Sequence, residues 1–411
     1  MQLRTARTLA LCLGLASSVA ALAETSPYYI GANQAFSYNS NLYSTQSNEL
    51  ASWYSTTSIV GGFDQSVGRQ HFYGSGNFGY NYFFNNDARN LNSNSYGVNV
   101  GWDWETVERL SGTARLTANQ SLVYYSIGGG QPNAQQKNIQ NLSQADLTGR
   151  YGISPDIALN LGYTYRRVNF SAEQYAYEEY NQNTGSIGLT YGSHGIWTYG
   201  AAFRFQRTEY PFYPHPFPST KLGDTGDGKN FDFTIKWVPS GLSTVDVRLS
   251  YSDINYDINN GRDFNGFNGS LTWTWNPTGK IFSGLTLIGA PGDSSTFYAF
   301  IGEPVRVDTS RFARTIRWYG TYLATGKTKF TWNLSLTKDY LEQTIFSSTQ
   351  QGSDLVTTGS LGVSYAPTRN SQLACNVGYL DRSASDNALR WGMSYPYSTT
   401  TFSCSGQLVL Q

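Results

Sequence analysis

The chain has 411 residues, of which only 14% are charged, and its 28 Lys and Arg balance its 28 Asp and Glu. Balanced charge argues against a nucleic-acid binder, which needs a basic surface. After the N-terminus no stretch approaches 18 consecutive apolar residues, so the sequence predicts no transmembrane helix. Abundant Tyr, Trp and Gly with few charges argue against disorder and fit a β-barrel that crosses a membrane.

The first 23 residues read as a secretory signal peptide. Arg4 and Arg7 form the basic start, and the apolar core Leu9–Ala16 is too short to span a bilayer. Ala21-Leu22-Ala23 is a small-x-small cleavage site. We therefore expect residues 1–23 to be the signal peptide and residues 24–411 to form one β-barrel domain in the outer membrane of a Gram-negative bacterium.

The stretch Gln70–Phe84 shows the alternation on which this interpretation depends. Its even positions are aromatic or Gly, and its odd positions are mostly polar. Side chains of a β-strand alternate between two faces. One such strand also fits a soluble sandwich, but the pattern continues in Asn94–Glu105, in Ile157–Tyr165 and in Trp197–Phe205. A lipid-facing strand of a membrane barrel has this apolar and polar pair of faces.

The same alternation predicts about eighteen strands along the mature chain. Their approximate ranges are 28–37, 53–65, 70–84, 93–105, 111–126, 138–152, 156–170, 181–192, 196–210, 230–238, 243–256, 264–275, 280–290, 310–325, 328–342, 353–366, 371–383 and 395–410. We expect an all-β fold, a transmembrane antiparallel up-and-down barrel.

The predicted connections alternate between short and long. After even-numbered strands they are short and carry turn residues, as in Val67-Gly68-Arg69 and Pro239-Ser240-Gly241. After odd-numbered strands they are longer and polar, as in Asn39–Ser52, Pro211–Lys229 and Gly292–Asp308. Short periplasmic turns and long extracellular loops are typical of outer-membrane barrels. An even number of strands places both termini at the periplasmic rim.

Two cysteines remain in the mature chain, and we expect them to form a disulfide. Cys375 and Cys404 lie on the last two predicted strands, and a hairpin that pairs them turns at Leu389–Arg390. Both share the parity of their strand's apolar face. An exported protein folds in an oxidising compartment, which favours a cross-strand bridge over two free thiols.

The polar parity of the strands predicts the side chains that face the lumen. These are Arg115, Arg150, Arg166, Arg204, Lys236, Arg248, Arg317 and Lys329, together with Asp103, Glu105, Asp146, Asp232 and Asp246. One interpretation is that they pair across strands and stiffen the wall. The other is a mildly cationic channel in which Tyr73, Phe83, Tyr125 and Tyr319 offer stacking surfaces for sugar rings. Around eighteen strands leave an aqueous channel.

The sequence gives little support for a catalytic site or a metal site. Of three histidines, His71 and His194 fall beside predicted turns and His215 lies in a loop, so we expect no enzyme, no cofactor and no histidine metal site. The acidic stretch Asp253–Asp263 has ligands for Ca²⁺, but a solvated loop is the simpler interpretation. Thr208–Thr220, rich in Pro and aromatics, either folds into the lumen as a constriction or packs on the rim.

Four stretches carry a resemblance to a known family: PYYIGANQAFSYNSNLY, SIVGGFDQSVGRQHFYGSGNFGYNYFFNN, WDWETVERLSGTARLTANQSL and FSCSGQLVLQ. They resemble the EpsL-type outer-membrane barrels, which are associated with exopolysaccharide biosynthesis operons and exosortase (PEP-CTERM) systems. The resemblance covers most of the mature chain, but its motifs are strand and turn patterns and identify no chemistry.

The resemblance implies a channel or assembly component for export of extracellular polysaccharide. Its implied partners are outer-membrane lipid, polysaccharide and periplasmic polysaccharide-export components. Two alternatives stay open: a general porin for small solutes, and a structural or adhesive barrel whose long loops carry the function.

Overall fold

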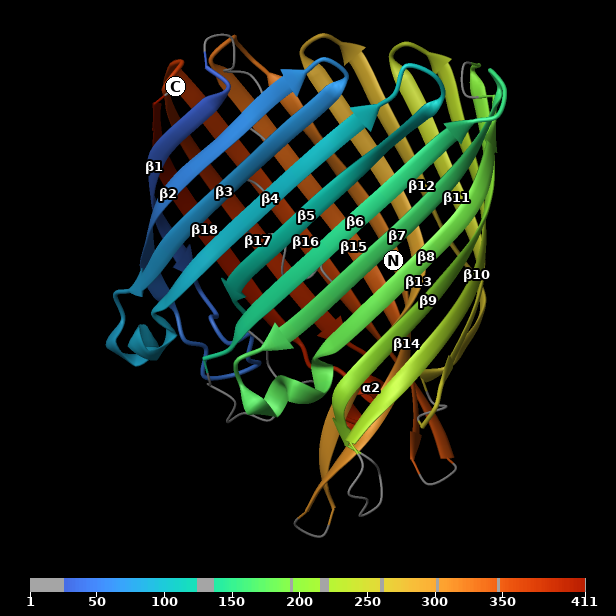
Figure 1. Cartoon of the computed structure of the whole chain (residues 1–411). Helices are drawn as coiled ribbons and strands as arrows, with labels where there is room; N and C mark the ends of the chain where they lie inside the picture. The colour runs from blue at the N-terminus through green and yellow to red at the C-terminus, as the bar shows by residue number, and fades with distance from the viewer. Residues whose placement is uncertain are drawn as a thin grey trace.

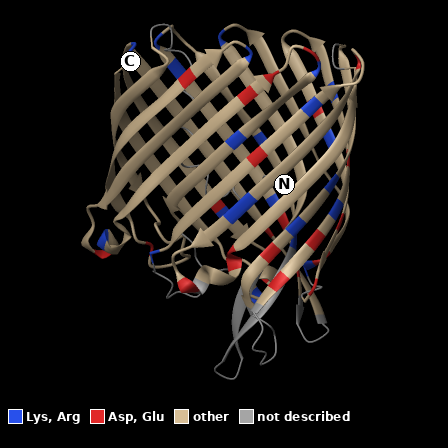
Figure 2. Ribbon diagram, in the orientation of Figure 1, with Lys and Arg blue, Asp and Glu red and all other residues tan. Residues whose placement is uncertain are grey.

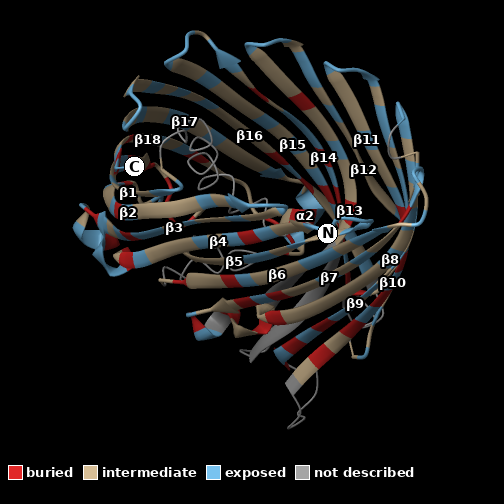
Figure 3. Ribbon diagram, turned by 45° about the horizontal axis from the view of Figure 1, so that its top comes forward, coloured by how far each residue is buried: buried red, intermediate tan, exposed pale blue. Residues whose placement is uncertain are grey.

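The computed structural model describes residues 26–123, 137–192, 195–214, 222–258, 262–300, 303–345 and 348–410. Within them, eighteen antiparallel strands form one sheet that closes on itself, because β1 pairs with both β2 and β18 (Figures 1 and 3). The strands are β1 (Tyr28–Asn39), β2 (Ser52–Val67), β3 (Gln70–Phe83), β4 (Ser93–Glu105), β5 (Leu110–Leu122), β6 (Ile139–Gly152), β7 (Ile157–Phe170), β8 (Tyr180–Tyr191), β9 (Trp197–Pro214), β10 (Leu222–Ser240), β11 (Ser243–Tyr256), β12 (Phe264–Thr278), β13 (Ile281–Phe300), β14 (Glu303–Leu323), β15 (Thr328–Ile345), β16 (Ser348–Thr368), β17 (Ser371–Ala384) and β18 (Tyr397–Leu410).

Each strand pairs with the next one in the sequence, so the predicted up-and-down barrel of eighteen strands is confirmed. Among the described residues, no helix has both the length and the apolar character that a membrane crossing requires. The short helical segments are η2 (Asn86–Leu91), η3 (Glu173–Glu178) and α2 (Asp386–Arg390). All three lie in connections at the same rim of the barrel (Figure 1).

The two faces of the closed sheet differ in polarity and in crowding. Side chains diverge on the convex outer face, where Phe203 and Leu249 are 56% and 57% exposed. They converge on the concave inner face, where Ser250 and Ser252 are 1% and 2% exposed. We call these the outer face and the inner face. The apolar parity of the strands is the outer one, which is the arrangement of a barrel surrounded by lipid.

The two rims also differ. At the short-turn rim, pairs such as Gly68-Arg69 and Gly241-Leu242 connect consecutive strands, and Gly68 has the positive φ of 61° that a tight turn requires. β1 begins and β18 ends at this rim. At the opposite, long-loop rim, the connections 40–51 and 385–396 separate their strands.

Two predicted long loops are instead strands. Pro211–Lys229 was expected to be a loop, but β9 continues to Pro214 and β10 begins at Leu222. A register shift between Leu222 and Asp224 accommodates the prolines, which cannot donate ladder hydrogen bonds. Most of Gly292–Asp308 likewise belongs to the hairpin of β13 and β14, whose ladder continues as far as the pair Phe300↔Glu303. These hairpins extend beyond the long-loop rim (Figure 1).

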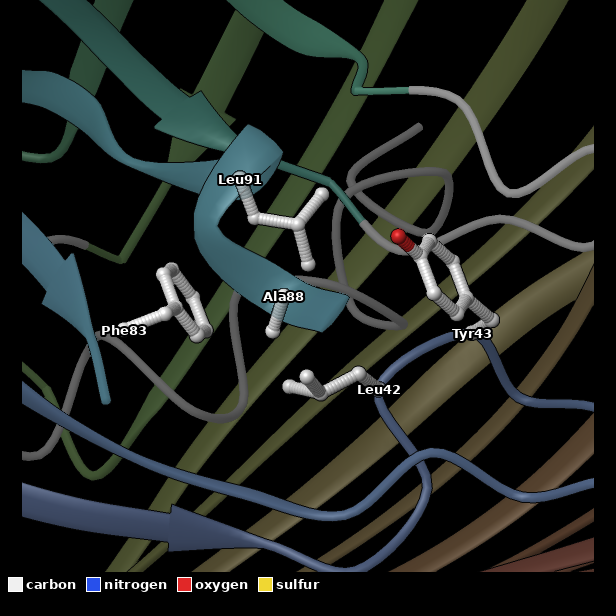
Figure 4. Packing of buried hydrophobic residues seen from close by; sticks show 5 residues of the cluster. All are labelled: Leu42, Tyr43, Phe83, Ala88 and Leu91. Carbon is white, nitrogen blue, oxygen red and sulfur yellow. The ribbon is translucent and has the colours of Figure 1, made fainter. Parts of the chain in front are cut away.

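Connections at the long-loop rim pack against the ends of the strands at that rim. Leu42, Tyr43, Phe83, Ala88 and Leu91 form one buried cluster under η2 (Figure 4). Farther around the ring, Ala388 of α2 packs with Leu341 and Met393. The Cβ of Ala388 would lie only 2.9 Å from a Cβ added at Gly352, so the glycine at position 352 lets α2 approach β16. These contacts hold the loops at the mouth of the barrel.

Candidate functional site in the lumen

The strand registers place every predicted lumenal charge on the inner face. Arg115 lies opposite Asp146, Lys236 opposite Asp246, and Arg317 opposite Ser335, and each pair shares the polar parity of its strands. The same parity holds for the remaining predicted positions, which are Arg150, Arg166, Arg204, Arg248, Lys329, Asp103, Glu105 and Asp232. Charged residues lie along the strands as well as at the rims (Figure 2).

One group of these charged side chains is held by contacts within the wall, and the charges of Arg204 and Asp232 are neutralised there. Arg204 donates to both carboxylate oxygens of Asp232, at 2.8 and 3.1 Å, and Ser250 donates to the same carboxylate at 2.5 Å. Arg166 is 8% exposed and lies 6.0 Å from the ring centre of Tyr180. Asp146 accepts hydrogen bonds from Gln144 and Thr164. These side chains stiffen the wall, which is the first of the two interpretations above.

Three further ion pairs were missed at the sequence level. Arg311 pairs with Asp339 at 2.5 Å, and Arg382 pairs with Asp354, which also accepts from Ser394 at 2.8 Å. Arg262 lies 3.9 Å from Asp224. Four of these charged residues, on β14 to β17, have the inner parity of their predicted strands, so the alternation alone could place them on the inner face, although it could not show that they pair. Arg262 belongs to a connection, where no alternation exists.

Arg262 also anchors an aromatic cluster at the long-loop rim. Its guanidinium carbon lies 4.2, 5.3 and 4.5 Å from the ring centres of Tyr210, Tyr213 and Tyr256. Tyr210 and Tyr213, within the predicted loop Thr208–Thr220, are 3% and 2% exposed. They pack inward as a continuation of β9. Residues 215–220 lie outside the described residues.

A second group of lumenal charges is exposed and forms no ion pair among the described residues. Arg115 and Arg317 are the clearest members. Each donates its Nε to an asparagine on the neighbouring strand, Arg115 to Asn99 at 2.8 Å and Arg317 to Asn333 at 2.6 Å. The hydrogen bond fixes the side chain and leaves the two terminal guanidinium nitrogens without a hydrogen bond to any described residue. The guanidinium carbon of Arg317 also lies 5.2 Å from the ring centre of Tyr319. Arg150, Lys236 and Lys329 also form no ion pair within the described part of the chain.

Arg115 and Arg317 lie on opposite walls at nearly the same height. They belong to β5 and β14, which are nine strands apart in either direction around an eighteen-strand ring. Arg115 follows the first residue of β5, Leu110, by five positions, and Arg317 precedes the last residue of β14, Leu323, by six. Strands spaced about 4.8 Å apart and tilted about 40° give a ring roughly 36 Å across between backbones.

Two lumenal tyrosines lie near these arginines along the wall. A Cβ added at Gly101 would meet the ring of Tyr73 at 2.1 Å, and one at Gly284 would meet the ring of Tyr319 at 2.4 Å. Each ring therefore lies flat across a glycine of the neighbouring strand. Of the other predicted stacking residues, Phe83 is 0% exposed beneath η2, so that prediction was wrong, and Tyr125 lies outside the described residues.

The structure contains the predicted disulfide. Cys375 and Cys404 are partners in the β17–β18 ladder and are joined by an S–S bond of 2.08 Å. They share the outer parity of Leu373, Val377 and Phe402. The bridge therefore faces lipid, apart from the lumen.

The histidines assemble no catalytic arrangement within the described residues. His71 lies on the inner face near the short-turn rim, 2.8 Å from Asp64 and 3.5 Å from Asp103, with no serine or cysteine in the contact. His194 and His215 lie outside the described residues. Among those described, no cluster of three or more His, Cys, Asp or Glu is arranged to hold a metal ion.

No family model matches this chain, and no curated protein does either. Solved structures do match. A bacterial polysaccharide outer-membrane secretin is 10% identical, with 93% of this chain and 98% of that one covered, at a TM-score of 0.36. OpdK of Pseudomonas aeruginosa with vanillate is 12% identical, with 93% of this chain and 99% of that one covered, at a TM-score of 0.45. The FrpB iron transporter of Neisseria meningitidis is 8% identical, with 94% of this chain and 82% of that one covered, at a TM-score of 0.49. Similarity at this level carries no conclusion about what passes through this barrel.

Proposed function

We propose that the protein is an outer-membrane channel that passes acidic extracellular polysaccharide. The observation that carries the proposal is the pair Arg115 and Arg317, which are exposed on opposite walls of the lumen and form no ion pair among the described residues, although Asp146 is the ladder partner of Arg115. The location follows from the fold, because a closed barrel with an apolar outer face is the form in which β-strands cross a bacterial outer membrane.

The chemistry of the lumen favours an anionic chain. A guanidinium whose Nε is already held by Asn99 or Asn333 presents its remaining donors at a fixed angle, and such donors match carboxylates. The flat rings of Tyr73 and Tyr319 supply apolar surface beside the charges. A uronic-acid polymer offers both matching features, a carboxylate and the apolar face of a sugar ring.

The size of the ring is also suitable. A backbone ring roughly 36 Å across loses space on each side to lumenal side chains and still leaves room for an extended sugar chain. This agrees with the resemblance to EpsL-type barrels. Its implied partners, periplasmic polysaccharide-export components, would dock at the short-turn rim.

A single-channel experiment tests the proposal. The purified protein is reconstituted in a planar bilayer, and oligogalacturonate or neutral dextran of matched length is added to one side. We expect oligogalacturonate to interrupt the current at concentrations at least tenfold below those needed for dextran. Arg115→Gln with Arg317→Gln should remove most of this difference. Lys280→Gln, on the short-turn rim outside the lumen, is the matched control and should retain it.

The alternatives predict other outcomes. A general porin would show equal interruption by the charged and neutral sugars, with no effect of the arginine variants. A structural or adhesive barrel would show no conductance. Either result would contradict the proposal.

A further inference from the structure

The outer face carries one basic pair that the proposed channel does not use. Arg314 of β14 and Lys338 of β15 are direct partners in the antiparallel ladder. Both have the apolar, outer parity of Ile316 and Leu336, and both are exposed. Like charges directly opposite each other destabilise a pair of strands. A counter-charge from outside the protein would remove that repulsion.

The pair is organised around one aromatic ring. The guanidinium carbon of Arg314 lies 4.9 Å from the ring centre of Tyr340, and the Nζ of Lys338 lies 5.3 Å from it. Tyr340 is 40% exposed. The ring therefore gathers both cations at one point of the outer face and leaves their donors available.

No acidic side chain neutralises the pair among those that the structure describes. The ladder partners on the flanking strands are Gly289 on β13 and Leu355 on β16. The next outward acid along β15 is Glu342, which accepts a hydrogen bond from Gln351 at 3.3 Å. Elsewhere on the outer face, Arg207 forms an ion pair with Glu209 at 3.4 Å. The Arg314–Lys338 pair has no such acidic neighbour among the described residues.

The height of the pair decides what can reach it. On β15 the outward apolar residues begin at Phe330 near the short-turn rim, and Lys338 and Tyr340 follow eight and ten positions later. On a strand tilted about 40°, eight residues rise roughly 20 Å and ten residues roughly 25 Å, which is the height of the apolar band of such barrels. Tyr340 therefore lies at the upper edge of this band, and Arg314 and Lys338 lie roughly 5 Å below it, where their long side chains reach the level of lipid headgroups.

We propose that Arg314, Lys338 and Tyr340 form a binding site for the phosphate of an anionic lipid headgroup in the leaflet at the long-loop rim. Two cations about one ring match the charge of a phosphate monoester. The apolar residues Ile316 and Leu336, below the pair on the same strands, contact the acyl chains. The inference rests on the transmembrane fold and is independent of what passes through the lumen.

Native mass spectrometry of the delipidated, detergent-solubilised barrel tests the site. Diphosphorylated lipid A is the probe, and its dephosphorylated form and inorganic phosphate are the comparisons. We expect lipid A to bind the wild type about tenfold to thirtyfold more tightly than Arg314→Gln with Lys338→Gln. Arg207→Gln is the matched control and should bind as the wild type does. Lipid A should also raise the unfolding temperature of the wild type and leave that of the double variant unchanged.

Equal binding of lipid A to the wild type and the double variant would overturn the proposal. Equal binding of the dephosphorylated lipid would overturn it too, because the phosphate would then contribute nothing. Competition by inorganic phosphate at the concentration at which lipid A binds would assign the site to free phosphate and contradict a lipid ligand. If the double variant fails to fold, Lys338→Gln alone provides the same comparison, with a smaller expected loss.

Discussion

Arg204 and Asp232 form a two-pronged ion pair across the β9–β10 ladder, with 14% and 11% of their side chains exposed. Arg204 faces the lumen, as predicted, but its charge is already matched within the wall. Lumenal charges are therefore of two kinds. Those in buried pairs hold the barrel together, and those held only by a neutral residue remain available to a solute.

This distinction predicts opposite phenotypes for two lumenal arginines. Arg204→Gln leaves the buried carboxylate of Asp232 without its hydrogen-bonded cation, and only Arg248 remains as a nearby positive charge. Breaking a buried pair in this way should cost roughly 3 kcal/mol. Arg115→Gln removes an exposed charge and should change the free energy of unfolding by less than about 0.5 kcal/mol. Urea unfolding of the barrel refolded into lipid vesicles measures both values. Equal stability of the two variants would show that Asp232 is not held by Arg204.

The disulfide should be formed in the mature protein and should affect folding more than final stability. Cys375 and Cys404 are 29 positions apart, and closing a loop of about 30 residues is worth on the order of 3 kcal/mol in the unfolded chain. In a closed barrel the neighbouring ladders already restrict these strands, so Cys404→Ser should slow folding and lower stability by less than that. Thiol labelling of the unreduced, denatured protein checks the bond, and labelling of both cysteines would contradict it.

The assignment of faces is tested by two arginines placed on one strand. Leu361 of β16 is 60% exposed on the outer face, and Leu361→Arg should cost about 1–2 kcal/mol because it lies in the lower part of the apolar band, opposite Trp332. Thr358, three positions away, has inner parity, and Thr358→Arg should cost less than about 1 kcal/mol. Urea unfolding in vesicles compares them. The reverse order would mean that the outer and inner faces are exchanged.

Much of the fold follows from alternation alone. A period of two is the property of a strand that faces lipid on one side and water on the other, so strands such as Ile157–Phe170 were predicted nearly to their observed ends. The positions of Cys375 and Cys404 and their shared parity together predicted that they pair. Turn residues such as Gly68 identified the short-turn rim.

The long hairpins and the charge pairs were harder to predict. Prolines at 211 and 214 indicate a loop, yet a register shift beside Asp224 keeps β9 and β10 paired as far as Pro214. Parity shows which face a side chain takes, but it does not show whether a neighbour neutralises it. Arg204 and Arg115 have the same parity signal, and only the cross-strand contacts separate the ion pair from the exposed cation.

The most direct test of the account is the reversal potential of the reconstituted channel in a tenfold KCl gradient. Exposed lumenal cations act over roughly 8 Å at physiological salt, so we expect the wild type to prefer anions and Arg115→Gln with Arg317→Gln to shift toward cations. Lys280→Gln should leave the reversal potential unchanged. A cation-selective wild type, or a double variant with the same reversal potential as the wild type, would contradict a lumen whose selectivity is set by these two arginines.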